Sequence, residues 1–401
     1  MDSVEIRGPV YDGANFAAIF ATDGVNDTGD FDYYLEMNST TFAGFYYDLD
    51  TGASTEVLRI YNTTTNGAVT VATGKVLDED AIEYNTTITA VEYEFGDTGD
   101  AWDGTTYNVI GIFAEEFIPL TATTPDKVAK LLVDSDDKTT LRTGQALELG
   151  GGYAITAQQV DVEGNKVWLE LTKDGEFVED EIVDLTGAAG AGANWTYTPD
   201  IEDEDNVEVM KVFVSDVFQG QVDSLAVIEA VWLMAFDDVR IIEDDDKFGV
   251  FEVAVGTSSL VFTNPNSITL SENTVKDLAE GMSFKVADDV GTDLRFYLMK
   301  EHTEPGTYEV RGTVVEDAGS TWTAADFAGF YYNLDDDVST ETLTISGISN
   351  NDRSIEEDEL SYNTSIQSVG FEFGDAGDAW AADTYDVIAI FAEEFIPLTA
   401  T

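Results

Sequence analysis

A long internal repeat is the feature that most constrains the fold of this 401-residue chain. Residues 93–123 and 371–401 are identical at 24 of 31 positions, at an offset of 278. Upstream, FAGFYYDLD from Phe42 matches FAGFYYNLD from Phe327, and VEIRGPV near the start resembles YEVRGTV from Tyr308. Because the matched stretches recur in the same order, we expect two copies of one structural unit.

The repeat divides the chain into modules that we call A, B and A′. Module A covers residues 4–123, module B covers 127–300, and module A′, a partial repeat of A, covers 306–401. Proline and small or polar residues at the two joints, TATTPD and KEHTEPGT, predict short linkers.

Strand and hairpin patterns dominate the middle of the chain. Residues 153–162 and 166–172 alternate apolar and polar side chains, and Asp174-Gly175 then leads into 176–183. Asp-Gly between alternating runs predicts a type I′ turn, since both of its central positions need a positive φ. Residues 127–134 fit a short helix or a strand. We therefore predict an all-β fold of tandem antiparallel β-sandwich modules joined by short linkers.

The composition limits which classes of partner the chain can bind. There are 80 Asp and Glu residues against 18 Lys and Arg, which gives a formal charge of −62. This excess argues against nucleic acid as a partner, because phosphate binding needs clustered Lys and Arg. No run of 18 apolar residues occurs, so we expect no membrane span in this chain. Such acidic surfaces also suit work in high salt.

The sequence offers little to catalysis. It has no cysteine and one histidine, His302, which excludes disulfides, thiolate sites and His-rich zinc sites. We expect His302 to be a solvated linker residue that gains charge readily. Carboxylate pairs for glycoside hydrolysis do not stand out among so many acids. Glu115-Glu116 lies in the repeated FAEEFIPL, which favours an architectural role. We predict a protein that is not an enzyme and has no cofactor.

Four acidic runs are the candidates for metal binding. Calcium takes six to eight oxygen ligands, and none of these runs has the spacing of a known calcium loop. We expect solvated turns that bind divalent cations weakly. The runs are Asp48–Gly52, Glu202–Asp205, Asp244–Asp246 and Asp335–Asp337.

Several residues occupy matching positions in the two copies. Arg7 matches Arg311, and because cations are scarce we expect a structural ion pair or a guanidinium bonded to loop carbonyls. Trp102 matches Trp380, and matched tryptophans predict core positions.

Asn-x-Ser/Thr sequences mark candidate glycosylation sites. Asn85 and Asn363 are equivalent in the repeat, so we expect both side chains to be exposed. Occupied sites would make N-linked glycans partners of the chain. The six candidates are Asn26, Asn38, Asn62, Asn85, Asn194 and Asn363.

Long stretches of this sequence resemble a known family. Residues 127–183, 212–233, 243–253 and 278–297 resemble the S-layer duplication domain of methanogenic archaea of the Methanosarcina group. VEIRGPVYDG and FAGFYYDLD match the start of that domain, so one full copy covers residues 4–300.

The resemblance implies an extracellular protein of the cell surface. Domains of this kind are built from β-sandwiches and tile a porous, negatively charged, glycosylated sheet without catalytic residues. We therefore predict a structural subunit of an archaeal surface layer or sheath, whose acidic pores act as a charge-selective sieve. Family members usually bring a signal peptide and an anchored stalk, so we expect either an excised part or a subunit that assembles differently.

Two further expectations concern partners. Module A′ has no second module B beside it in the sequence, so we expect other copies of the chain to supply its neighbour. Such a contact is heterologous and head-to-tail, and it grows into a string, a tube or a sheet. The alternative function is a secreted adhesin or carbohydrate-binding protein that uses loop aromatics.

Overall fold

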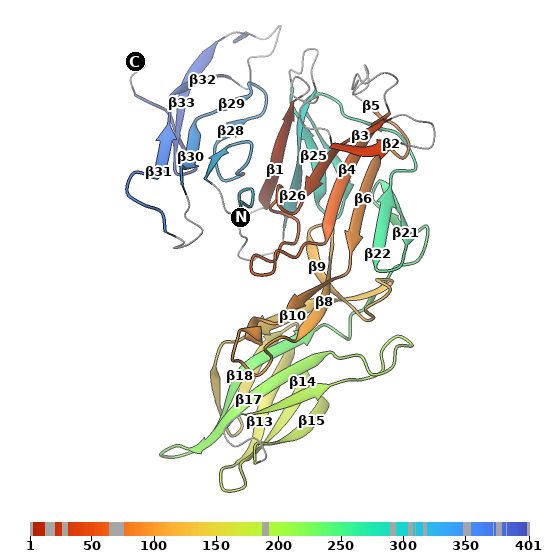
Figure 1. The fold of residues 1–401 in the computed structure, drawn as a ribbon, viewed down its shortest axis with the longest axis vertical. Coiled ribbons are helices and arrows are strands. Elements are labelled where there is room, and N and C mark those ends of the chain that lie inside the picture. The colour runs from red at the N-terminus through yellow and green to blue at the C-terminus, as the bar shows by residue number, and fades with distance from the viewer. Residues whose placement is uncertain are drawn as a thin grey trace.

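The chain is all-β, as predicted (Figure 1). The structure is a computed structural model that describes residues 3–12, 21–25, 31–63, 76–186, 192–288, 294–303, 308, 310–315, 319–347, 354–371, 373, 379–381 and 383–398. Among these residues the regular elements are antiparallel β-strands and one short 3₁₀ helix, η1 (Glu94–Gly96). They form three parts, which we call the body, the arm and module A′.

The body is a sandwich of two sheets. One has the order β1 (Val4–Asp12), β26 (Arg295–His302), β25 (Met282–Val286) and β24 (Thr274–Ala279). The other has the order β2 (Ala21–Val25), β3 (Phe31–Asn38), β4 (Glu56–Thr63), β6 (Ile82–Thr87), β22 (Ser259–Thr263), β21 (Phe251–Val255) and β20 (Lys247–Phe248). A small pair, β5 (Val76–Leu77) and β23 (Ile268–Thr269), lies beside them. Side chains from both sheets, such as Leu298 and Phe262, form one buried core.

The arm is a second sandwich at the lower end of the molecule in Figure 1. Its longer sheet has the order β16 (Ala193–Tyr197), β17 (Met210–Gln219), β18 (Ser224–Met234), β10 (Lys127–Ser135), β9 (Glu115–Pro119), β8 (Thr106–Ile112) and β7 (Thr89–Glu92). β11 (Thr139–Arg142) pairs with β18, and β19 (Arg240–Ile241) pairs with β10. The facing sheet is β12 (Ala146–Gly150), β13 (Tyr153–Asp161), β14 (Lys166–Lys173) and β15 (Glu176–Asp184). Trp102 and Trp232 belong to its buried core.

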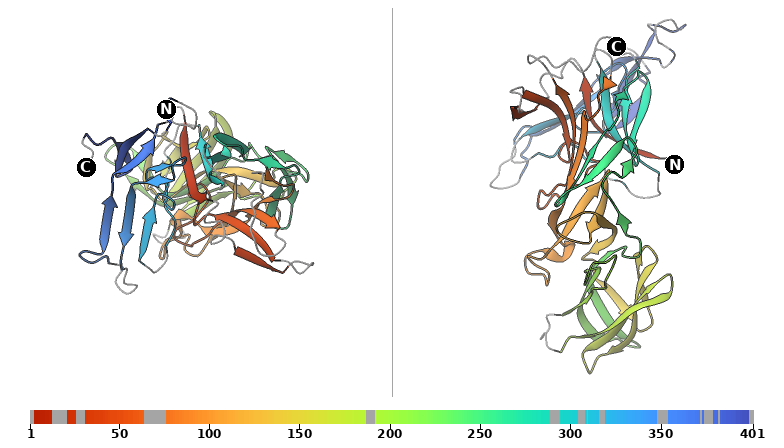
Figure 2. Two further views of the ribbon diagram at one scale, coloured as in Figure 1. Left: turned by 90° about the horizontal axis from the view of Figure 1, so that it is seen from above. Right: turned by 90° about the vertical axis from the view of Figure 1, so that its right-hand side faces the viewer.

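Module A′ forms small sheets that lie beside β1 in both Figure 1 and Figure 2. One contains β27 (Ser320–Thr323), β30 (Glu341–Ile345) and β31 (Leu360–Thr364). Another contains β32 (Gln367–Gly370), β33 (Thr384–Ile390) and β34 (Glu393–Phe395), and a third pairs β28 (Tyr332–Asn333) with β29 (Val338–Ser339). From the repeat, β30, β31, β33 and β34 correspond to β4, β6, β8 and β9 of module A.

The sheets cross the module boundaries expected from sequence. β22 of module B pairs with β6 of module A, and β26 pairs with β1. β10 continues the sheet of β9. The expected boundaries therefore mark the repeat in the sequence, but they do not separate two folded units. Strands of modules A and B pair in both sandwiches. Module A is completed by module B.

Candidate functional site

A buried glutamate marks the same position in both copies of the repeat. Glu56 accepts hydrogen bonds from the backbone N–H of Tyr46 at 2.9 Å, the hydroxyl of Tyr84 at 2.7 Å and the N–H of Ala114 at 2.8 Å. In module A′, Glu341 accepts the corresponding bonds from Tyr331, Tyr362 and Ala392 at 3.0, 2.6 and 2.9 Å. The two modules therefore share their interior, and module A′ has the structure of A without its cover.

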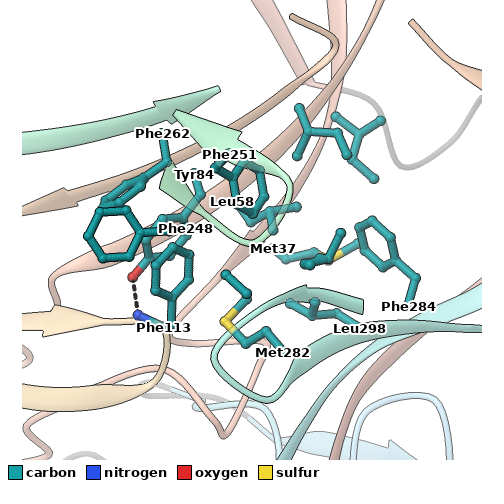
Figure 3. Close-up of a cluster of buried hydrophobic side chains, with 14 of the residues drawn as sticks. Met37, Leu58, Tyr84, Phe113, Phe248, Phe251, Phe262, Met282, Phe284 and Leu298 are labelled. Atoms are coloured by element: carbon teal, nitrogen blue, oxygen red, sulfur yellow. Dashed lines mark hydrogen bonds between the residues drawn. The ribbon is translucent and has the colours of Figure 1, made fainter. Parts of the chain in front are cut away.

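The cover of module A is an aromatic cluster supplied by module B. Figure 3 shows Phe113, whose N–H is bonded to the hydroxyl of Tyr84, among Phe248, Phe251 and Phe262. The ring centroids of Phe113 and Phe262 are 4.9 Å apart. These three module B rings lie on β20, β21 and β22, so the three strands that extend the body sheet also cover Phe113.

The corresponding surface of module A′ is open. Phe113 is 0% exposed but its equivalent Phe391 is 74% exposed, and Trp102 at 1% compares with Trp380 at 49%. The prediction of core positions is thus confirmed for Trp102 and wrong for Trp380, because the residues that cover Trp102 come from module B. Module A′ exposes Ile355 and ten further apolar residues, and we call these ten the A′ face: Leu360, Ile366, Phe371, Phe373, Trp380, Ile390, Phe391, Phe395, Ile396 and Leu398.

Two strand edges border the A′ face. In module A, β6 pairs with β22 and β9 pairs with β10. In the described part of module A′, β31 pairs only with β30, and β34 pairs only with β33. An unpaired edge beside apolar side chains is a template for an added strand. The A′ face therefore has the shape and chemistry that module A offers to module B.

Arg7 and Arg311 exchange partners between the copies. Arg7 donates to the carbonyl oxygens of Phe327 and Phe330 in module A′, both at 3.4 Å. Arg311 donates to the equivalent carbonyls of module A, on Phe42 and Phe45, at 3.5 and 3.2 Å. The expectation of a guanidinium bonded to loop carbonyls is confirmed. The exchange between copies was not foreseen, because sequence equivalence does not say which copy supplies the carbonyls.

We predict that this arginine exchange holds module A′ against the body. Arg311→Ala should lower the stability of the contact by about 1–3 kcal/mol, because buried carbonyls lose a charged donor. Lysine should not restore it, since one ammonium does not reproduce the forked guanidinium. Hydrogen exchange of the Val314 amide, which bonds to the Thr40 carbonyl at 3.0 Å, would report the loss. Arg59→Ala, which removes a surface pair with Glu36, is the control. Unchanged Val314 protection in Arg311→Ala would contradict the prediction.

An acidic cavity of about 760 Å³ lies where module A meets β10. Tyr46, Tyr47 and Tyr107 line part of its wall. Neither lysine nor arginine is among its lining residues in the described part of the chain. Its carboxylates are Asp48, Asp50, Glu92, Glu94, Asp97, Glu116, Asp134 and Asp136.

Burial in this cavity makes two carboxyl groups hard to ionise. Burial, with the charges of Asp134 and Asp48 as lesser causes, raises the pKa of Glu116 to about 7. Burial also raises the pKa of Asp134 to about 6, although a hydrogen bond from the Glu94 N–H lowers it. The two groups thus keep their protons at a pH where they would ionise in the unfolded chain.

This difference predicts that stability falls as pH rises. Below about pH 4 both states hold the protons, and between about pH 4 and 7 the unfolded chain loses them first. Glu116→Gln should therefore raise the free energy of unfolding by about 1–3 kcal/mol at pH 8, with little effect at pH 4.5. Urea titrations at the two pH values measure this. The exposed Glu181→Gln is the control, and an equal gain at both pH values would contradict the assignment.

The acidic runs form turns, and in three of them carboxylates accept hydrogen bonds from backbone N–H groups. In the fourth, Glu202–Asp205, the Glu204 carboxylate pairs with Lys127 at 2.7 Å. Asp48 accepts from the N–H of Asp50 and of Thr51, both at 2.9 Å. Asp244 accepts from Val255 N–H at 2.7 Å, and Asp335 accepts from Asp288 N–H at 2.8 Å. Among the described residues, no three or more of these acids are grouped as metal ligands would be.

The glycosylation candidates differ in exposure. Asn363 and Asn194 are exposed. Asn85 is half-buried in a central strand between Val57 and Val261, so the expectation of equal exposure fails there. The reason is that β22 covers the edge of β6. Asn38 is half-buried, and its Oδ1 accepts from Thr40 N–H at 3.1 Å. Asn26 and the side chain of Asn62 lie outside the described residues.

His302 is not the solvated linker residue that we expected. It ends β26, is half-buried, and stacks on Tyr308 with ring centroids 4.2 Å apart. Burial lowers its pKa, so the imidazole gains charge less readily than a free one. The linker signal misplaced it because β26 runs further than its apolar pattern.

Comparison with known proteins decides the family. A profile of the family described as "S-layer protein" matches residues 26–288 and 311–401. The chain belongs to the S-layer protein family. The Major S-layer protein of Methanosarcina barkeri (strain Fusaro / DSM 804) is 46% identical to this S-layer family chain over 401 residues. That alignment covers 100% of this chain and 56% of the relative.

Two further relatives give the same result. The Major S-layer proteins of Methanosarcina acetivorans and Methanosarcina mazei are 46% and 47% identical over 401 residues. The alignments cover 99% and 100% of this chain and 57% of each relative. The S-layer family chain therefore spans a little over half the length of these relatives. Among its described residues, no helix is long and apolar enough to cross a lipid bilayer.

Proposed function

We propose that this chain is a structural subunit of an archaeal extracellular surface layer or sheath, located at the cell surface. The observation that carries this proposal is the A′ face. An exposed apolar surface on an otherwise acidic protein marks an interaction site. The equivalent surface of module A takes a B-type module, by which we mean a sequence folded like residues 127–302. The names and full-chain similarity of the relatives agree with this role.

We propose that growth is head-to-tail. Arg7 and Arg311 both find their partners within one chain. Contacts between neighbouring subunits must therefore use other surfaces. The A′ face of one unit meets a different surface of the next unit, and a contact of that kind does not close on itself. Repetition builds a string, a tube or a sheet.

Charge sets the conditions for assembly. Units with a formal charge of −62 repel one another, so assembly should need salt or divalent cations that screen or bridge carboxylates. We propose weak, plural cation binding by the acidic turns for this reason. The same charge lines the pores of the layer and favours small cations and neutral solutes over polyanions. N-linked glycans at Asn363 and Asn194 fit their exposure.

We further propose that the chain is not an enzyme. Of the repeated acids Glu115 and Glu116, Glu115 has structural partners: it pairs with Lys130 at 2.9 Å and with Lys300 at 3.5 Å. The exposed aromatics do not favour the alternative of a carbohydrate-binding protein, since their equivalents Phe113 and Trp102 are core residues.

Electron microscopy of concentrated protein tests the proposed function. We expect ordered sheets or tubes at about 0.15 M salt with calcium, and dispersed particles after chelation at low ionic strength. Glycan binding and turnover assays should be negative. Glycan binding by particles that never assemble would support the adhesin and reject the lattice.

A further inference from the structure

The body and the arm meet at a joint that is crossed by continuous strands. Figure 1 shows β8, β9 and β10 between the two sandwiches. β8 begins against the arm core, where Tyr107 packs, and ends in the body core, where Ile110 and Ile112 are buried. Because one strand belongs to both cores, the angle of the arm depends on the contacts that body and arm make beside it.

One of these contacts is a clamp made by Arg240. This residue lies on β19 of the arm, and it donates twice to the carboxylate of Glu280, in the turn between β24 and β25 of the body, once at 3.1 Å. Its guanidinium also lies 4.7 Å from the ring centre of Phe248 on β20. The buried Lys300 donates to the Glu280 carbonyl at 2.7 Å. Glu280 is therefore fixed to the body, and its bonds to Arg240 tie the arm to it.

The acidic cavity is the second place where body and arm meet. One wall is the body loop of residues 46–51, and the other walls come from the arm sheet. Asp48 and Glu56 accept hydrogen bonds from N–H groups of the loop itself. Among the described residues, no hydrogen bond or ion pair joins this loop to the arm walls. Packing alone therefore holds these walls together.

Acidic groups face Glu116 of β9 from every wall of the cavity. The tyrosines Tyr46, Tyr47 and Tyr107 are the other titratable groups of the lining. The acids are Asp134 and Asp136 from the β10 segment, Glu92 from β7, Glu94 and Asp97 from the η1 segment, and Asp48 and Asp50 from the body loop.

No cation among the lining residues offsets these acids in the described part of the chain. Lys211 of β17 interacts with the charge of Asp134, but its ammonium lies over two rings outside the lining. It is 4.4 Å from the ring centre of Tyr93 and 4.5 Å from that of Trp102. Ionised carboxylates in the cavity therefore repel one another across the joint, and they gain hydration when its walls separate.

We propose that the joint between body and arm is a hinge that responds to pH. The walls of the acidic cavity stay together while its carboxyl groups hold protons, and they separate when these groups ionise. The Arg240 clamp restrains the movement.

The direction of the response follows from the two most buried carboxyl groups of the cavity. In the closed joint, burial raises the pKa of Glu116 to about 7 and that of Asp134 to about 6. In the open joint both groups are hydrated and ionise near their ordinary values. Between about pH 4 and 7 the open form therefore loses its protons first, so rising pH favours opening.

A change in the arm angle matters for assembly. In a layer this angle sets the distance between neighbouring subunits, and this step alone rests on the proposed function. The hinge is a property of the single chain, so a measurement on unassembled protein tests it. Failure of the chain to form a layer would leave the hinge intact.

Distances between spin labels on the two sides of the cavity test the hinge. The chain has no cysteine, so Leu49→Cys in the body loop and Thr98→Cys beside Asp97 of the arm wall place one label on each side. Both positions are exposed. From pH 5 to pH 8 the ratio of long to short distances should rise about tenfold or more, because each unit of pKa difference is a factor of ten. The pair Thr98→Cys and Thr140→Cys lies within the arm and should not change.

Neutral variants identify the carboxyl groups that drive the response. Glu116→Gln combined with Asp134→Asn should keep the short distance at both pH values, whereas the exposed Glu181→Gln should keep the full change. The same distance distribution at pH 5 and pH 8 would overturn the proposal, and so would a full response in the double variant. A change in the arm pair would show loosening of the arm, which also overturns it.

Arg240→Ala tests the clamp. It should raise the ratio of long to short distances about two- to fivefold at both pH values, because a partly exposed ion pair is lost, and it should leave the pH dependence in place. Lys166→Ala, which removes an exposed pair with Asp184 inside the arm, is the control. An unchanged ratio in Arg240→Ala would contradict the restraining role of the clamp.

Discussion

Phe113→Ala should lower the free energy of unfolding by about 3–5 kcal/mol, whereas Phe391→Ala should lower it by less than about 1 kcal/mol. The two residues are equivalent in the repeat and each stacks on a tyrosine, at ring distances of 4.7 Å for Tyr84 and 4.6 Å for Tyr362. They differ in what covers them, since Phe113 leaves a cavity among the module B rings and Phe391 faces solvent.

Urea unfolding of the two variants measures this difference. The pair is its own control, because chemistry and local geometry are the same at both positions. A loss at Phe391 as large as that at Phe113 would show that the A′ face is covered in the free chain. That result would remove the basis for its role in assembly.

Lys300→Met should also cost about 3–5 kcal/mol, because it removes one partner from a buried polar cluster. The Lys300 ammonium is buried and donates to the carbonyls of Phe113 and Glu280 at 2.8 and 2.7 Å. It lies 3.5 Å from Glu115. Burial lowers the pKa of Lys300, and nearby carboxylates, Glu115 first, oppose this.

Lys130→Met is the matched control for Lys300. Lys130 pairs with the same Glu115 at 2.9 Å, but its side chain is exposed, so the loss should be less than about 1 kcal/mol. If both variants lost the same free energy of unfolding in thermal or urea experiments, the hydrogen bonds from Lys300 to buried carbonyls would contribute nothing to stability.

Local features of the fold follow from the sequence. Asp174 and Gly175 have φ of 51° and 83°, as the predicted turn requires, and they join β14 to β15. The long strand β17 ends at Gln219, and Gly220 follows in the turn before β18. Residues 127–134, which fit a helix or a strand, lie in β10, because the neighbouring edges of β9 and β18 offer it a place.

Long-range features do not follow in the same way. The pairing of β22 with β6 joins residues such as Val261 and Asn85 that are far apart in sequence, and no local pattern encodes such a choice. The repeat predicted equal environments for Trp102 and Trp380, but environment depends on module B. The arginine exchange was visible only as two matched cations. The acidic cavity needed the fold to bring Glu116 and Asp134 together.

The central claim is that the A′ face is an assembly surface of a layer-forming subunit. Electron microscopy of Phe391→Asp beside Phe391→Tyr, in calcium-containing buffer, tests it most directly. A buried carboxylate at an apolar interface is costly, whereas tyrosine keeps the ring. We predict ordered sheets or tubes for the unmodified chain and for Phe391→Tyr, and single particles for Phe391→Asp. An unchanged lattice in Phe391→Asp would contradict the claim.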